Sequence, residues 1–202
     1  LLEGARYCWG EKTIRVLIGL AFFSGIFAFS YVALLPIFAK DILHVDARGL
    51  GLLGSAAGVG SIAGVFITPW LSNRFHVGRL IIIEIIAMSA VLMIFAFSRS
   101  YLLSLAMMPF IGFVAFSNVT LIAIATQMIV PDHLRGRVMG MQSLRWTLMP
   151  LGGALLGAVA NFFGAPFALG GAALAVFLVT LLVGLFNPQI RNLGDLNSRE
   201  QE

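Results

Sequence analysis

The stretch Pro131–Gly140, PDHLRGRVMG, decides the fold, because it gathers Asp132, Arg135 and Arg137 between two long apolar runs. Each neighbouring run extends for more than twenty residues with almost no charge. A helix needs roughly 20 residues to cross a hydrocarbon core of about 30 Å. The pattern therefore predicts a short charged loop that joins two membrane-spanning helices.

The rest of the chain repeats this pattern over its 202 residues. Hydrophobic residues make up 59% and charged residues 11%, whereas an ordinary soluble domain carries roughly 25% charged residues. A core of this size cannot hide so much apolar surface from water, so the surrounding medium must be lipid. Because the backbone must satisfy its own polar groups in lipid, and the alternating segments of a β-barrel are absent, the sequence predicts an all-α membrane protein.

Six runs are long enough to span the membrane, and together they predict a helical bundle over residues 16–187. The runs are Val16–Ala39, Leu50–Leu71, Leu80–Ser98, Tyr101–Val130, Val138–Phe163 and Pro166–Phe186. Residues 1–15 mix apolar and charged side chains and are expected to form an interfacial lead-in on the cytoplasmic side. Residues 188–202 are expected to form a polar cytoplasmic tail.

Basic residues are distributed unequally between the two sides of this predicted bundle. The side that holds the N-terminus carries nine, which are Arg6, Lys12, Arg15, Arg74, Arg79, Arg135, Arg137, Arg191 and Arg199. The other side carries three, which are Lys40, Arg48 and Arg99. Because short loops rich in Lys and Arg stay in the cytoplasm, we expect both termini to be cytoplasmic and the protein to reside in the inner membrane.

Small residues suggest where the predicted helices approach one another closely. The second run contains the pairs Gly54/Gly58 and Gly60/Gly64, a spacing that lets two helix backbones come together. The fifth run contains Gly153 and Gly157 after Pro150, which removes a backbone hydrogen bond and favours a bend.

Four stretches resemble the C-terminal six-helix half of a major facilitator superfamily transporter, and most closely its drug and siderophore exporters of the enterobactin type. Tyr31–Leu43, YVALLPIFAKDIL, is similar to the end of the seventh span and its outer loop in that family. Pro131–Gly140 is similar to the loop between its tenth and eleventh spans. Leu2–Tyr7 is similar to the helix that leads into the seventh span.

The fourth similar stretch is Leu71–Leu80, LSNRFHVGRL, which resembles the superfamily loop signature glycine-x-leucine-x-aspartate-arginine-x-glycine-arginine. The matching residues are Leu71, Arg74, Gly78 and Arg79. Asn73 stands in the place of the aspartate, and Pro69 in the place of the first glycine. The substitution of the aspartate argues against a full charge relay through this loop.

The resemblance implies two inverted three-helix repeats and a substrate site at the membrane midplane, between this half and an N-terminal six-helix half. It implies export of a small amphipathic molecule by alternating access, coupled to protons and without a cofactor. The first and fourth spans would line the substrate cavity. The second and fifth would contact the other half, and their glycine-rich faces suit that contact.

Two charged residues lie inside predicted spans and are candidates for ion pairing or coupling. Glu84 is the only acidic residue in any run, and a charge in lipid is costly enough to mark a functional candidate. It lies about 7.5 Å along the helix from Arg79, so an ion pair with Arg79 or a loop arginine is the structural alternative. Arg145 lies about 12 Å beyond Arg137 and would pair with the missing half, bind an anionic substrate group or extend to the surface.

Aromatic and amide side chains are candidates for the wall of the substrate cavity. Phe23, Phe27 and Tyr31 recur at helical spacing in the first run and are expected on one face. Asn118, with Thr120 and Gln127, is the polar counterpart in the fourth run. Packing against lipid is the alternative for the aromatic residues.

Charged and amide residues of two loops are candidates for a gate on the cytoplasmic side. They are Asn73, Arg74, Arg79, Asp132, Arg135 and Arg137. Their simpler role is to anchor the topology.

Other classes of protein fit less well. An intramembrane enzyme would need histidines at membrane depth, but His44, His76 and His133 all fall in predicted loops, and the single Cys8 excludes a cysteine-rich metal site. A channel would need a ring of like charges or a broken-helix filter, and the sequence displays neither. No nucleic-acid partner is expected. Because the chain begins without Met, we expect a segment of a longer transporter, and the alternative is a half-size transporter that acts as a homodimer.

Overall fold

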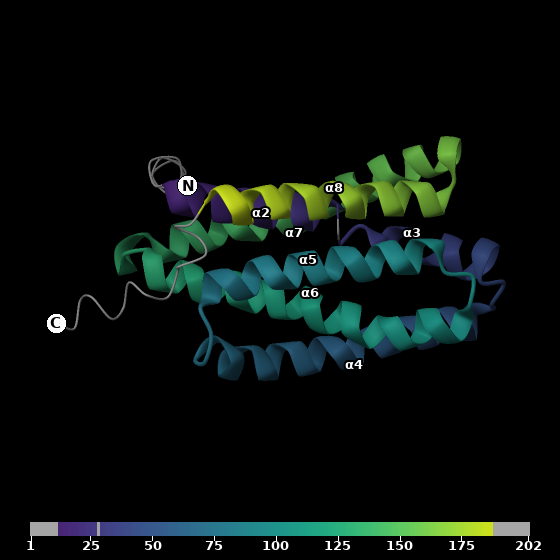
Figure 1. Cartoon of the computed structure of the whole chain (residues 1–202), viewed down its shortest axis with the longest axis horizontal. Helices are drawn as coiled ribbons and strands as arrows, with labels where there is room; N and C mark the ends of the chain where they lie inside the picture. Colours follow the sequence, from purple (N-terminus) through teal and green to yellow (C-terminus); the bar gives the residue numbers. More distant parts are fainter. Residues whose placement is uncertain (1–11, 28, 188–202) are drawn as a thin grey trace.

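The computed structural model describes residues 12–27 and 29–187, which form a bundle of helices (Figure 1). The helices are α2 (Lys12–Phe27), α3 (Tyr31–Ile37), the π-helical turn η1 (Phe38–Ile42), α4 (Ala47–Ser72), α5 (Val77–Phe97), α6 (Tyr101–Ile129), α7 (Asp132–Phe163) and α8 (Ala165–Phe186). By length and composition, six stretches of the described chain can cross a membrane: Ile14–Ile42, Ala47–Ser72, Val77–Phe97, Tyr101–Ile129, Trp146–Phe163 and Ala165–Phe186. The predicted all-α, six-span fold is confirmed.

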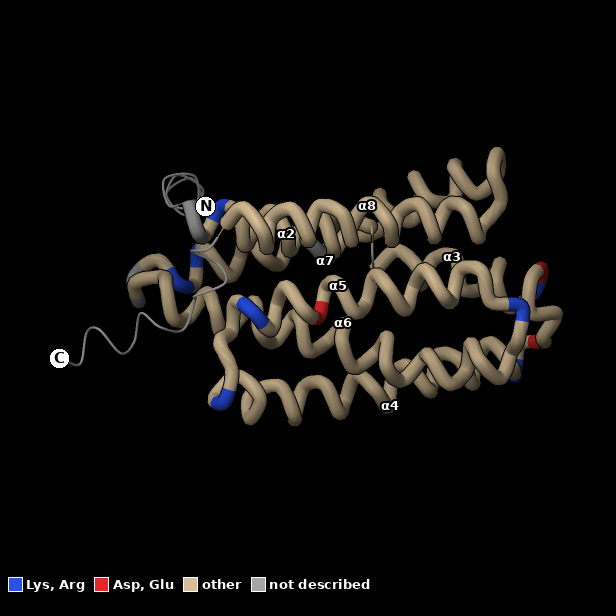
Figure 2. Tube along the Cα trace, in the orientation of Figure 1, with Lys and Arg blue, Asp and Glu red and all other residues tan. Residues whose placement is uncertain are grey.

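Charge lies at the two ends of the bundle, and the middle is almost entirely uncharged (Figure 2). We call one end the basic end, where the α4–α5 loop meets the end of α6 and the start of α7. It carries Arg74, Arg79, Arg135 and Arg137. This separation is what a bilayer requires, because a charge in the hydrocarbon core is costly.

The first span, Ile14–Ile42, covers the predicted run Val16–Ala39, but it contains a turn at Phe29 and Ser30 that the sequence did not predict; residue 28 lies outside the described residues. Helix α2 ends at Phe27, α3 begins at Tyr31, and η1 follows α3. Two groups compete for the α-helical hydrogen bonds here: the Ser30 hydroxyl donates to the carbonyl of Ile26, and the Phe29 N–H reaches the carbonyl of Ser24 at 3.3 Å. A serine hydroxyl that bonds four residues back often bends a helix.

The predicted loop at Pro131–Gly140 is also wrong in its extent. Pro131 caps the helix, and its carbonyl accepts the N–H groups of Leu134 and Arg135 at 3.0 and 3.1 Å. Proline suits a helix start because the first N–H groups have no partner within the helix. The charged residues after Pro131 therefore belong to α7, which extends by about 21 Å beyond its apolar part, Trp146–Phe163.

The packing of the spans follows the predicted repeat of three. The second span (α4) packs on the fourth (α6), the fifth (α7) on the first (α2), and the third (α5) on the sixth (α8). If spans one, two and three are exchanged with spans four, five and six, the pair of spans two and four becomes the pair of spans five and one. The pair of spans three and six stays the same. Because a three-span unit ends on the opposite side of the membrane from its start, the two repeats are inverted relative to each other.

The glycines of α4 divide between two environments. A methyl group at Gly60 would overlap the carbonyl of Pro109 in α6, and one at Gly64 would overlap that of Phe113. This pair therefore joins two helices of the same bundle, and the prediction that it contacts the other half is wrong. A methyl group at Gly54 or Gly58 would come within 4 Å of no described atom outside its own helix and chain neighbours, so the face that carries these two glycines is open.

Candidate functional site

Glu84 takes part in a chain of polar groups that connects three helices near the middle of the bundle. Glu84 belongs to α5, Ser117 to α6 and Thr68 to α4, and all three are buried. The Ser117 hydroxyl donates to Oε1 of Glu84, and the Thr68 hydroxyl oxygen lies 2.5 Å from both the Ser117 hydroxyl and the carbonyl of Gly64. The close approach of α4 and α6 at Gly64 is what brings these groups together.

Glu84 is thus bound by a hydroxyl group and not by Arg79, which the sequence analysis gave as one partner in the structural alternative of an ion pair. Arg79 is exposed and makes no ion pair with Glu84, whose second oxygen, Oε2, has no hydrogen-bond partner among the described residues. Two hydroxyl protons serve three oxygen–oxygen contacts in the chain. A proton on the carboxyl group would supply the third, with Glu84 donating to Ser117, Ser117 to Thr68, and Thr68 to Gly64. The geometry is therefore able to hold a protonated carboxyl group.

The break in the first span lies against α7. A methyl group at Gly152 would overlap the carbonyl of Ile26 and the hydroxyl of Ser30, and one at Gly153 would lie 2.9 Å from Ala33. On the α2 side of this contact, the rings of Phe29 and Trp146 meet edge to face at 5.9 Å. The glycines of α7 therefore allow its backbone to approach the first span next to the turn at Phe29 and Ser30.

The predicted aromatic face is only partly present. The rings of Phe23 and Phe27 pack together at 4.8 Å near the end of α2. Tyr31 is buried and begins a separate helix, so the predicted single-helix face ends at Phe27. The turn at Phe29 and Ser30 separates Phe27 from Tyr31.

The three polar candidates of α6 do not form one cluster. Asn118 is buried at 2% exposure, and neither its oxygen nor its nitrogen has a hydrogen-bond partner in the described part of the chain. The hydroxyl of Thr120 donates to the carbonyl of Phe116 at 3.0 Å. Gln127 is exposed at the basic end, and nine residues of helix turn it by about 180° from Asn118. Asn118 is the one of the three with an unmet demand for a polar partner.

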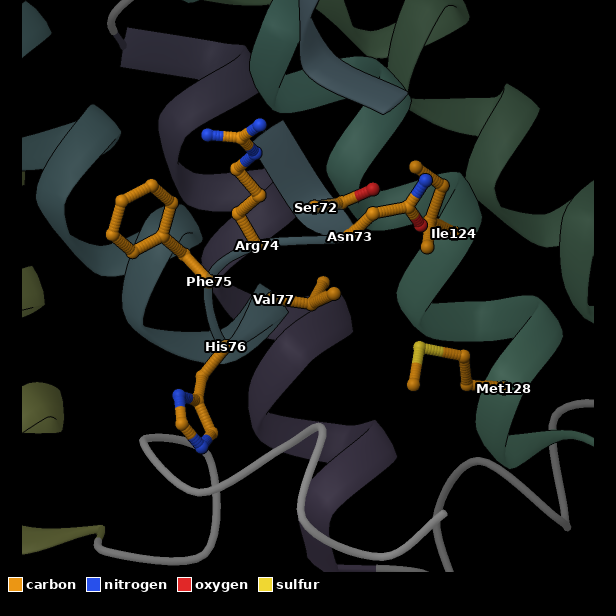
Figure 3. Close-up of a pocket in the computed structure, with 8 residues that line it drawn as sticks. All are labelled: Ser72, Asn73, Arg74, Phe75, His76, Val77, Ile124 and Met128. Carbon is orange, nitrogen blue, oxygen red and sulfur yellow. The ribbon is translucent and has the colours of Figure 1, made fainter. Parts of the chain in front are cut away.

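The α4–α5 loop and the end of α6 line an open cavity of about 510 Å³ at the basic end (Figure 3). Loop residues, including Asn73, Arg74 and His76, lie on one side, and Ile124 and Met128 of α6 lie on the other. The Arg74 guanidinium stacks on the Trp70 ring at 4.3 Å, which is a cation–π interaction. The predicted signature loop is thus the wall of an open, polar pocket.

The remaining predicted gate residues lie at the junction of α6 and α7. Arg135 donates to the backbone carbonyl of Gln127 at 2.9 Å and so connects the start of α7 to the end of α6. Arg137 is exposed on α7, and Arg79 is exposed on α5. The side chains of Asp132 and Arg145 lie outside the described residues.

Several polar residues of these clusters were missed by the sequence analysis. Thr68, Ser117 and Ser30 are single hydroxyl residues within apolar runs, and such residues are too common to stand out, even where, as for Ser117, a candidate amide (Asn118) is adjacent. Gln142 donates to the hydroxyl of Thr126 and so links α7 to α6 near the basic end. A spacing of four between Gly64 and Thr68 was the only available signal, because it places the hydroxyl on the glycine face. Among the described residues, no group of three or more His, Cys, Asp or Glu could hold a metal ion.

Comparison with known proteins identifies the family. The family described as transmembrane secretion effector matches residues 1–201. The chain is also 28% identical over 204 aligned positions to the multidrug efflux pump Tap of Mycolicibacterium fortuitum, which covers 98% of this chain and 48% of the relative. The chain thus spans about half the length of that relative, and no solved structure matches it significantly. The predicted resemblance to a drug exporter is confirmed: the chain belongs to the transmembrane secretion effector family of the major facilitator superfamily.

Proposed function

We propose that this chain is one six-helix half of a secondary transporter that exports small amphipathic molecules across the bacterial inner membrane. The observation that carries the proposal is the family match over residues 1–201, because it accounts for the whole six-span bundle. The name of the relative, a multidrug efflux pump, supports export as the direction. The excess of basic residues on one side supports cytoplasmic termini.

In this proposal the other half is the N-terminal six-helix half of the same polypeptide. Spans α4 and the apolar part of α7 are the least buried, at 17% and 11% of their residues against 56% for α5. Gly54 and Gly58 on α4 and Gly157 on α7 lie beside open space, which suits a close-packed neighbour. A homodimer of this chain is the alternative, and the mass of the native polypeptide separates the two: about twice 21.7 kDa supports the fused halves.

Transport proceeds in this proposal by alternating access around the broken first span. Transporters commonly place substrates at the midplane, beside discontinuous helices whose freed backbone groups contact the ligand. The interruption between α2 and α3, with Phe29 and Trp146 beside it, supports such a site for an amphipathic molecule. Asn118 needs a polar partner and would acquire one if α6 turned toward the substrate during the cycle.

Protons drive the export step in this proposal, and Glu84 carries the proton. The support is the hydrogen-bond chain to Ser117 and Thr68, which needs a carboxyl proton to complete all three contacts. Because these hydrogen bonds connect α4, α5 and α6, loss of the proton would change the contacts among three helices at once. Such a change links protonation to helix movement.

The test is efflux of a fluorescent amphipathic dye from vesicles that contain the full-length protein, with an imposed proton gradient. We expect dye movement that stops when the gradient is collapsed by an ionophore. Dye movement that continues unchanged after collapse would exclude proton coupling, and an absence of dye movement in either condition, over several dyes of different charge, would exclude export of this class of compound.

A further inference from the structure

An apolar groove with a single basic residue at one end runs between α5 and α8. Its volume is about 270 Å³, and its lining consists of Arg79, Ile82, Ile83, Ile86, Leu181, Gly184 and Leu185. Helices α5 and α8 pack directly on each other, so the groove is a depression along a formed helix pair. Apart from Arg79, which is also a predicted gate residue, none of its lining residues belongs to the sites described above.

The spacing of the lining residues sets the direction of the groove. Arg79 lies in the first turn of α5, and the isoleucines follow it at intervals of three, four and seven residues, which place them on the same face. The groove therefore extends for about 10 Å from the basic end toward the middle of the membrane. The α8 residues come from the last two turns of that helix, which returns to the basic end.

Gly184 allows Ile82 of α5 to pack closely on α8 within this groove. A methyl group at Gly184 would lie 3.1 Å from Cγ2 of Ile82, which is tighter than ordinary van der Waals contact. A larger side chain would therefore occupy the space between the two helices. A larger residue at position 184 would have to displace Ile82 and would so change the lining of the groove.

Arg79 is available to a ligand at the end of this groove. Its side chain is exposed, and in the described part of the chain it makes no hydrogen bond, ion pair or ring contact. Arg74, five residues earlier, is in a different situation because its guanidinium stacks on Trp70. A guanidinium at the level where a membrane helix meets the cytoplasm is complementary to a phosphate group, which it can bind with two parallel hydrogen bonds.

We propose that this groove binds one anionic phospholipid, with an acyl chain between the isoleucines of α5 and the leucines of α8 and the phosphate on Arg79. The acyl chain alone would give little selectivity, because lipid tails surround the whole bundle. Selectivity comes from the charge of the headgroup, and one basic residue near an anionic surface accounts for about a fivefold preference. The proposal depends on the membrane setting and not on which molecule is exported.

The experiment is native mass spectrometry of the full-length protein titrated with phosphatidylglycerol or with phosphatidylcholine. We expect one phosphatidylglycerol to bind about fivefold more tightly than phosphatidylcholine. Arg79→Gln should abolish this preference, and Arg79→Lys should retain part of it. Arg74→Gln is the matched control and should leave the preference unchanged.

A second pair of variants tests the groove itself. Gly184→Leu should weaken binding of both lipids, whereas Gly171→Leu, on the same helix beside open space, should not. Retention of full lipid binding by Gly184→Leu, with unchanged oligomeric mass, would overturn the proposal. If Arg79→Gln and Arg74→Gln had equal effects, the lipid preference would reflect general surface charge. If glycerol phosphate bound as tightly as the lipid, the site would bind a free anion. If Gly184→Leu disrupted a dimer, the groove would be the contact site of a second copy. Each of these outcomes contradicts the lipid site.

Discussion

The replacement of Glu84 by glutamine separates a structural role of this residue from a coupling role. Glutamine has nearly the same shape, and its amide group can donate to Ser117 as a protonated carboxyl group would. All three contacts of the chain through Ser117 and Thr68 can therefore remain. We expect Glu84→Gln to change the free energy of unfolding by less than about 1 kcal/mol, the typical worth of one hydrogen bond between membrane helices.

The alanine variant at the same position supplies the contrast in magnitude. Glu84→Ala removes the bond to Ser117, worth about 0.6 kcal/mol, and leaves a cavity in a buried site, which costs about 2 kcal/mol or more. We therefore expect a loss of about 3 kcal/mol, measured by unfolding in detergent micelles. Equal stability of the alanine and glutamine variants would contradict the packing described for Glu84.

Transport by the glutamine variant tests the coupling role. Glutamine does not titrate, so a folded Glu84→Gln protein should lose dye efflux driven by a proton gradient and retain dye binding. The measurement is the initial rate of efflux in vesicles, with the amount of folded protein determined in parallel. Full gradient-driven efflux by a folded glutamine variant would refute the assignment of Glu84 as the proton carrier and leave it a structural role.

Three further substitutions, one of them with a matched control, test the packing and the substrate site. Gly60→Leu should prevent close packing of α4 on α6 and lower the yield of folded protein, whereas Gly54→Leu, beside open space, should leave the yield of the isolated bundle unchanged; equal yields would contradict the packing. Gly152→Ala should lower the efflux rate at least tenfold, because the added methyl group displaces α7 from the broken first span. Protein yield is the control for folding, and an unchanged rate would argue that this contact is not functional. Asn118→Leu should raise the midpoint temperature of unfolding, because it removes a buried amide that has no partner among the described residues. The same variant should weaken dye binding. A lower midpoint temperature would mean that the amide has a stabilising partner.

The candidate site could be predicted from the sequence only in part. Glu84 was identifiable because an acidic residue in an apolar run is conspicuous, but its partners Ser117 and Thr68 lie 33 positions later and 16 positions earlier in the chain. Helix α5 is apolar on nearly every side, so its sequence does not mark the face that meets α6. The predicted partner, Arg79, was chosen by proximity along the chain, whereas the structure selects partners by the rotation of neighbouring helices.

The sequence by itself determined the family, through its loop motifs, and it determined the number and order of the spans, because the free energy of moving a residue from water to lipid is nearly a local property. Summed over about 20 residues, it identifies a span without knowledge of its neighbours. The tertiary structure alone decided where the first span breaks, which glycines are already occupied and what Glu84 binds. These features depend on which helices meet: Gly60 and Gly54 are indistinguishable in the sequence, yet only Gly60 lies against the backbone of α6.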